Sequence, residues 1–107
     1  ETFKFAVTAI CRDCKEILER NGLTFDDIAY IVPHQANQRI IDFASTKLKV
    51  PKEKFYLNIH KYGNTSSASI PIALDELNRA GKLHRGDLLL LPAFGGGLAS
   101  ACCLVRW

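Results

Sequence analysis

The fold is decided by a stretch in which a short apolar run gives way to a polar string, Ile28-Ala29-Tyr30-Ile31-Val32-Pro33-His34-Gln35-Ala36-Asn37-Gln38-Arg39. The run at residues 28–32 is apolar and partly β-branched, which predicts a buried parallel strand. Pro33 ends that strand, and residues 35–49 carry apolar side chains at helical spacing. A strand followed by a helix places His34 at the carboxyl end of the strand, where open α/β sheets bind their ligands.

The same alternation of helices and strands continues on both sides of this stretch. An amphipathic helix is predicted before it, at residues 3–21, and Gly22 is a natural C-terminal stop. The elements predicted after it are a strand at 55–59, a helix at 66–80, a doubly buried strand at 87–94, a glycine turn at 95–97 and an antiparallel strand at 98–105. The order α-β-α-β-α-β-β predicts one α/β domain over residues 1–107, with a mixed sheet flanked by helices.

Composition excludes several classes of protein. Apolar residues make up 48% of the 107 residues, which favours a compact globular domain over a disordered chain. No apolar run approaches the roughly 18 residues of a membrane span. The net charge of +3 is mild and evenly spread, so it does not indicate nucleic-acid binding, although an acidic partner could touch one local patch. The chain starts without Met or a signal-peptide pattern, which predicts a cytoplasmic protein and fits a piece of a longer chain.

The four cysteines are interpreted as reduced packing thiols. Cys11 and Cys14 have C-x-x-C spacing, but this pair falls in the middle of the first predicted helix, whereas redox pairs stand at helix N-termini after strands. A metal site would need a second pair, and Cys102 and Cys103 are adjacent in a predicted strand, where they point to opposite faces. The pattern therefore favours packing over metal or redox chemistry, because buried free Cys behaves as a small hydrophobe.

A second polar string, Asn58-Ile59-His60-Lys61-Tyr62-Gly63-Asn64-Thr65-Ser66-Ser67, follows the predicted strand at 55–59. Together with the string around His34 and the terminal Phe-Gly-Gly-Gly at residues 94–97, it resembles the C-terminal half of β-ketoacyl-acyl carrier protein synthase III. The resemblance covers essentially the whole chain and implies one half of a thiolase-like fold. That family also needs a nucleophilic Cys in its N-terminal half, and nothing here matches it. The resemblance therefore implies that this chain alone is inactive.

The resemblance implies roles for five residues near the active site. His34 and Asn64 would each donate a hydrogen bond to the thioester oxygen of a malonyl substrate; otherwise, His34 caps its own helix and Asn64 is a turn residue. The backbone N–H of Gly96 would stabilise the tetrahedral intermediate on the missing Cys, although the glycines also suit a plain hairpin turn. Asn37 would contact the pantetheine arm. Phe94 would lie beside the acyl tunnel, and a core position is the alternative.

A further set of basic residues matches the positions at which the family meets its acidic carrier protein or the phosphates of coenzyme A. Arg39 stands inside the first string, whereas Lys4 and Lys47 are assigned by position alone. The alternative for all three is a solvated face, the usual location of Lys and Arg. His60 and His84 carry no comparable signal and are interpreted as structural or surface residues.

The resemblance implies a decarboxylative Claisen condensation that initiates fatty-acid synthesis. An acyl group would pass from acyl-coenzyme A to the Cys of the N-terminal half and then to malonyl-acyl carrier protein. No metal or other cofactor is expected, because the thioester supplies the electron sink. The complete enzyme is expected to be a cytoplasmic homodimer that binds neither nucleic acid nor membrane. Two alternatives stay open: a related condensing enzyme of specialised metabolism, and a catalytically silent domain that binds carrier protein or coenzyme A.

Overall fold

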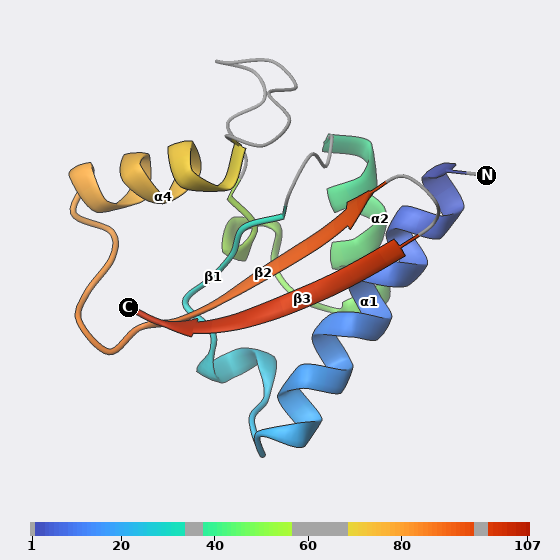
Figure 1. Ribbon diagram of the computed structural model, residues 1–107, viewed down its shortest axis with the longest axis horizontal. Helices are drawn as coiled ribbons and strands as arrows, with labels where there is room; N and C mark the ends of the chain where they lie inside the picture. The colour runs from blue at the N-terminus through green and yellow to red at the C-terminus, as the bar shows by residue number, and fades with distance from the viewer. Residues whose placement is uncertain (1, 34–37, 57–68, 96–98) are drawn as a thin grey trace.

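The sheet has three strands in the order β1-β2-β3 in the computed structural model, which describes residues 2–33, 38–56, 69–95 and 99–107. β1 (Tyr30–Ile31) runs parallel to β2 (Leu88–Gly95), and β3 (Ala99–Arg106) returns antiparallel to β2. The sheet is therefore mixed, as predicted. The helices α1 (Thr2–Arg20), α2 (Gln38–Leu48) and α4 (Ser69–Arg79) lie around it (Figure 1).

Glycines end two of the three α-helices in the described part of the chain. Gly22 follows α1 with a φ of +67°, and the N–H of Leu23 donates back to the carbonyl of Leu18 at 2.9 Å. The same carbonyl accepts from the N–H of Asn21 at 3.1 Å, so the turn at Gly22 pairs the end of the helix with the residues that follow it. α4 ends in the same way at Gly81, whose φ is +73°. α2 ends without glycine, because Lys49 adopts the left-handed conformation with a φ of +58°, which costs a non-glycine residue about 1–2 kcal/mol.

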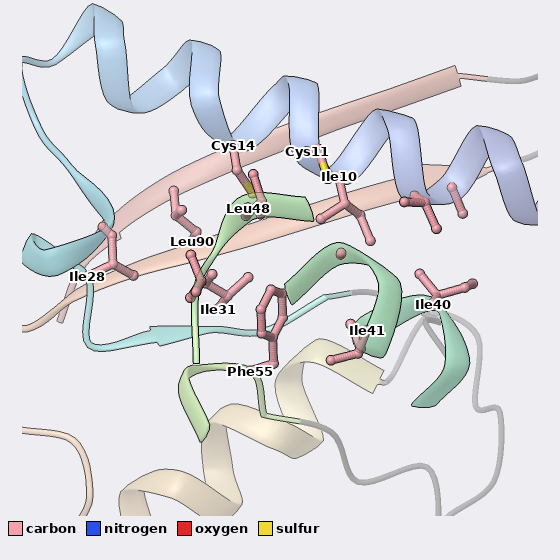
Figure 2. Packing of buried hydrophobic residues seen from close by; sticks show 14 of the residues in the cluster. Ile10, Cys11, Cys14, Ile28, Ile31, Ile40, Ile41, Leu48, Phe55 and Leu90 are labelled. Carbon is pink, nitrogen blue, oxygen red and sulfur yellow. The ribbon is translucent and has the colours of Figure 1, made fainter. Parts of the chain in front are cut away.

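Two hydrophobic clusters pack against opposite faces of the sheet. Neighbouring side chains on β2 point in opposite directions, so Leu90 packs in one cluster and Leu89 in the other, and both are fully buried. The larger cluster joins α1 and α2 to the sheet, and Figure 2 shows Ile10, Ile31 and Leu90 within it. The smaller cluster joins Leu89 to α4 and the end of β1. Helices therefore cover both faces, as expected for this class of α/β fold.

The first predicted strand is confirmed but is shorter than expected. β1 covers two residues, whereas the apolar run predicted five. Its hydrogen bonds extend one residue further at each end, because the N–H groups of Ala29 and Val32 donate to the carbonyls of Leu88 and Leu90, both at 2.8 Å. Pro33 has no N–H and ends this series of bonds.

The second predicted strand is described only at its start. Phe55 forms an isolated parallel bridge with Ile31, and the N–H of Tyr56 donates to the carbonyl of Ile31 at 2.9 Å. Residues 57–59 lie outside the described residues, as do the first residues of the predicted helices at 35–49 and 66–80. The predicted order of elements is therefore supported only where the chain is described. The returning strand is confirmed, and β3 starts at Ala99.

Each helix keeps a polar face toward solvent. In the last turns of α4, Leu77 is fully buried, but Asp75, Asn78 and Arg79 are exposed. The reason is that these polar side chains alternate with the apolar ones at helical spacing, so only one side of α4 packs on the sheet. Within the described ranges, no helix is long and apolar enough to cross a membrane.

Candidate functional site

Three segments of the chain reach the same edge of the sheet. β1 is parallel to β2, and Phe55 is bridged to Ile31 in parallel, so all three segments point the same way. Their last described residues are Pro33, Tyr56 and Gly95. Carboxyl ends of parallel strands meet at one sheet edge, which is where α/β proteins hold their ligands. His34 and Gly96 follow directly after Pro33 and Gly95 in the sequence, and Asn64 follows eight residues after Tyr56.

Four of the eight predicted site residues lie outside the described part of the chain. His34, Asn37, Asn64 and Gly96 all lie there, so their roles stay predictions. The backbone of Phe94 lies in β2, where it is paired with Ser100 of β3. The structure therefore fixes the segments that lead to the site.

Side-chain contacts fasten two of these segments. The ammonium of Lys54 donates to the carbonyl of Phe25 at 2.7 Å and to that of Ile28 at 2.6 Å. These bonds hold the turn that enters β1 against the segment that follows α2. The hydroxyl of Tyr56 lies 2.6 Å from Oε1 of Glu76, which ties this strand start to α4. Sequence reasoning did not single out Lys54, because a lysine in a polar connector carries no signal of its long-range contacts.

A groove of about 740 Å³ lies between α1 and α2, on the outer side of the helices. It brings together Lys4 and Lys47, two of the basic residues that were assigned by position alone, and both are exposed. Arg39 is also exposed and stands on α2, two turns before Lys47. The other side chains that line the groove are Val7, Thr8, Asp42, Phe43 and Thr46.

Phe43 is the groove residue that the sequence analysis missed. Its side chain is 54% exposed. The helical pattern of α2 could have revealed it, because Phe43 falls off the face formed by Ile40, Ile41 and Ala44. Basic groups around an exposed aromatic ring suit a partner that presents carboxylates or phosphates beside an apolar contact.

The one acidic group lining the groove among the described residues is already engaged. Gln38 donates a hydrogen bond to Oδ1 of Asp42 at 2.9 Å, and the ammonium of Lys52 lies 3.3 Å from the same oxygen. These contacts, led by the Gln38 bond, hold the pKa of Asp42 below its usual range. Asp42 is thus a carboxylate at neutral pH whose charge is partly offset by Lys52, so the lysines give the groove its net positive character.

The packing interpretation of the cysteines is confirmed for Cys11 and Cys14, which are both buried in the larger cluster. Burial raises the pKa of the Cys11 thiol, with partial opposition from Lys47 and Lys15. Within the described ranges, no group of three or more His, Cys, Asp or Glu side chains is arranged to hold a metal ion.

A family model described as 3-oxoacyl-[acyl-carrier-protein (ACP)] synthase III C terminal matches residues 18–107. The chain belongs to this family. A beta-ketoacyl-[acyl-carrier-protein] synthase III of Clostridium novyi is 54% identical over 107 residues, which are all of this chain and 33% of that relative. The chain thus spans about a third of the length of the synthase III relatives that it matches.

Solved structures agree with this family assignment. The crystal structure of 3-oxoacyl-[acyl-carrier-protein] synthase III from Aquifex aeolicus is 50% identical, with a TM-score of 0.93 over 98% of this chain and 34% of that one. The synthase III structure from Pseudomonas aeruginosa is 39% identical, with a TM-score of 0.93 over 99% of this chain and 33% of that one. These synthase III structures confirm the predicted α/β fold, a thiolase-like mixed sheet flanked by helices.

Proposed function

We propose that this chain is the C-terminal catalytic part of a 3-oxoacyl-acyl carrier protein synthase III that initiates fatty-acid synthesis. The observation that carries the proposal is the family match over residues 18–107, which includes both polar strings and the α2 side of the groove. The complete enzyme condenses acyl-coenzyme A with malonyl-acyl carrier protein. It is a cytoplasmic homodimer, and this chain alone is inactive because the nucleophilic Cys belongs to the N-terminal part.

The first half-reaction is acyl transfer. The Cys thiolate of the N-terminal part attacks the thioester carbonyl of acyl-coenzyme A, and the coenzyme A thiolate leaves. The N–H of Gly96 stabilises the negative oxygen of the tetrahedral intermediate, since glycine lets the backbone approach the thioester closely. Phe94 lies beside the acyl chain, and Asn37 binds the pantetheine arm. The thioester substrates supply the electron sink, so this mechanism needs no metal or cofactor.

The second half-reaction uses His34 and Asn64 on one oxygen. Malonyl-acyl carrier protein loses CO₂, and the electron pair of the broken carbon–carbon bond moves into an enolate. His34 and Asn64 donate hydrogen bonds to the enolate oxygen, which lowers the barrier to decarboxylation. The enolate carbon then attacks the acyl-enzyme, and the Cys thiolate leaves, which produces 3-oxoacyl-acyl carrier protein.

The groove between α1 and α2 docks the acidic carrier protein. Lys4 supplies positive charge from α1 and Lys47 from α2, and Phe43 supplies an apolar contact in the same groove. Arg39 adds charge at the end of α2 nearest His34 in the sequence. Charges on such a rim act mainly on the rate of association and its salt dependence.

The test separates the two half-reactions in the complete enzyme. His34→Ala and Asn64→Ala should each slow CO₂ release from malonyl-acyl carrier protein by on the order of 10²–10³, while acyl transfer to Cys from labelled acyl-coenzyme A survives. The double variant should lose less than the product of the two single losses, because the residues act as one unit. Exposed residues of the same types, changed by His84→Ala and Asn78→Ala, are the matched controls and should leave both steps unchanged.

Three outcomes would change the proposal. Loss of acyl transfer with intact CO₂ release in His34→Ala would make His34 a base for the Cys. Absence of both activities from the unaltered complete enzyme, with retained carrier-protein binding, would instead favour the silent binding domain. Activity with acyl substrates outside fatty-acid synthesis would favour the enzyme of specialised metabolism.

A further inference from the structure

Two cysteines that are far apart in the sequence meet between α1 and β3. The sulfur of Cys14 lies 4.0 Å from the sulfur of Cys102, although 88 positions separate them in the chain. Cys14 is fully buried on the sheet-facing side of α1, as Figure 2 shows, and Cys102 is half-buried against the larger cluster. Cys103 is exposed and points to the other face of β3. The spacing along the chain gave no indication that Cys14 and Cys102 meet.

The backbone around the two thiols is held by a second contact between the same elements. Nη2 of Arg12 donates to Oγ of Ser100 at 2.7 Å, and each of these residues stands two positions before one of the cysteines. A disulfide requires the sulfurs to approach to about 2.05 Å. The two sulfurs therefore lie about 2 Å further apart than in a disulfide, a gap that rotation about the Cα–Cβ bonds of the two cysteines has to close.

Only Cys102 of this pair lines a surface hollow. A hollow of about 230 Å³ opens beside it, and the other residues that line it are Asp13, Glu16, Ile17, Arg20, Ser100 and Ala101. One water occupies about 30 Å³ in the liquid, so the hollow admits a molecule as small as hydrogen peroxide. Cys14 lies behind Cys102, inside the cluster. An oxidant that enters the hollow therefore meets Cys102 first.

The contact between the two sulfurs also shifts the pKa values of the two thiols in opposite directions. Either sulfur can be the donor in the contact between Cys14 and Cys102, and this contact lowers the pKa of Cys102 despite its partial burial and the nearby Asp13 carboxylate. The same contact, together with burial, raises the pKa of Cys14. Thiolates are the nucleophilic form of cysteine, so Cys102 is the more reactive of the two.

We propose that Cys102 is a peroxide-reactive thiol and that Cys14 resolves it into an intrachain disulfide between α1 and β3. The Cys102 thiolate attacks one peroxide oxygen, the O–O bond breaks, and hydroxide leaves, which forms a sulfenic acid. The sulfur of Cys14 then attacks the sulfur of Cys102, the S–O bond breaks, and the proton of Cys14 leaves with the hydroxyl as water. Overall, two thiols lose two electrons and two protons to one hydrogen peroxide, and two waters form.

The test is thiol mapping in the folded polypeptide in which this chain occurs naturally. The protein is treated with hydrogen peroxide, free thiols are alkylated, and proteolytic peptides are identified by mass spectrometry. The expected product is a Cys14–Cys102 linked peptide that has lost two hydrogens and that separates on treatment with dithiothreitol. Cys14→Ala should abolish the linked peptide and leave Cys102 to accumulate as the sulfinic acid. Cys11→Ala and Cys103→Ser are the matched controls and should retain the link.

Thiol mapping of the unaltered protein alone shows whether the Cys14–Cys102 link forms, so the result does not depend on whether a variant folds. Oxidation of Cys102 to sulfinic acid without the link would overturn the role of Cys14. An unmodified Cys102 under conditions that oxidise Cys103 would overturn the reactivity of Cys102. A link that joins Cys103 to another chain, with Cys14 left free, would likewise contradict the proposal.

Discussion

Lys54 connects the described fold to the edge of the sheet where the predicted site residues follow, and Lys54→Met tests that connection. Methionine keeps a long apolar stem but removes the ammonium. The ammonium makes two hydrogen bonds, to Phe25 at 2.7 Å and to Ile28 at 2.6 Å. Each bond from a charged donor contributes about 1.5–3 kcal/mol.

The net cost should be smaller than two full bonds. The carbonyl of Phe25 also accepts from the N–H of Ile28 at 3.1 Å, so it keeps one partner in the variant. Lys54 is half-buried, so water can replace part of what is lost. We therefore expect local opening of the turn before β1 to become easier by about 2–3 kcal/mol, which corresponds to a roughly 30- to 150-fold faster amide exchange.

Hydrogen–deuterium exchange of the folded protein, resolved at the amides of Ala29 and Val32, measures this opening directly. Both amides are bonded to β2 and report on β1 alone. Lys52→Met is the matched control: its ammonium is exposed and lies 3.3 Å from Asp42, so it should change the exchange at β1 by less than threefold, as expected for a surface ion pair. Equal exchange in the two variants, or protection of Ala29 and Val32 unchanged by Lys54→Met, would refute the reasoning.

Two further predictions concern the groove. In the complete enzyme, Lys4→Glu should raise the KM for acyl carrier protein about fivefold at low salt and less at high salt. Lys82→Glu, in the turn after α4, is the control and should leave this KM unchanged. Equal effects of the two variants would mean that the overall charge of the protein matters rather than the groove. Gln38→Leu should raise the pKa of Asp42 toward its usual range, measured by NMR titration. The lowered pKa of Asp42 stabilises the fold above the unfolded-state pKa, and this stabilisation is lost as pH falls through the folded-state pKa. The variant should therefore lose less stability on acidification. An unchanged pKa of Asp42 would assign the shift to Lys52 instead.

Periodicity predicted the described elements well, because it reflects which side of each segment is buried. The apolar stripe of α1 and the continuous apolar run of β2 are local patterns. On a sheet covered on both faces, the first predicts a helix with one buried side and the second predicts a strand buried on both faces. Glycine adopts the φ of Gly22 and Gly81 without strain, so a glycine after an apolar stripe indicates where a helix such as α1 or α4 ends. Lys49 ends α2 in that conformation with no sequence signal.

Pairs of residues that meet through packing could not be predicted from local pattern. Cys14 and Cys102 come together only because α1 lies across β3, and Lys4 and Lys47 share a groove only because α1 lies beside α2. Neither approach follows from spacing along the chain. The family resemblance named Lys4 and Lys47, but it could not place Phe43 between them, because an exposed phenylalanine is recognised only after the buried face of its helix is known.

The edge that leads to His34 depends on the same kind of long-range contact. A strand of two residues is too short to hold its own register, yet β1 is bonded to β2 on one side and to Tyr56 on the other. Lys54 then fastens the turn that enters β1. The position of Pro33 is therefore set by segments more than 20 residues away. His34 follows Pro33 in the sequence, so the segment that leads to it is held by contacts that its own polar string does not contain. We therefore expect Lys54→Met to act on this segment from outside the string.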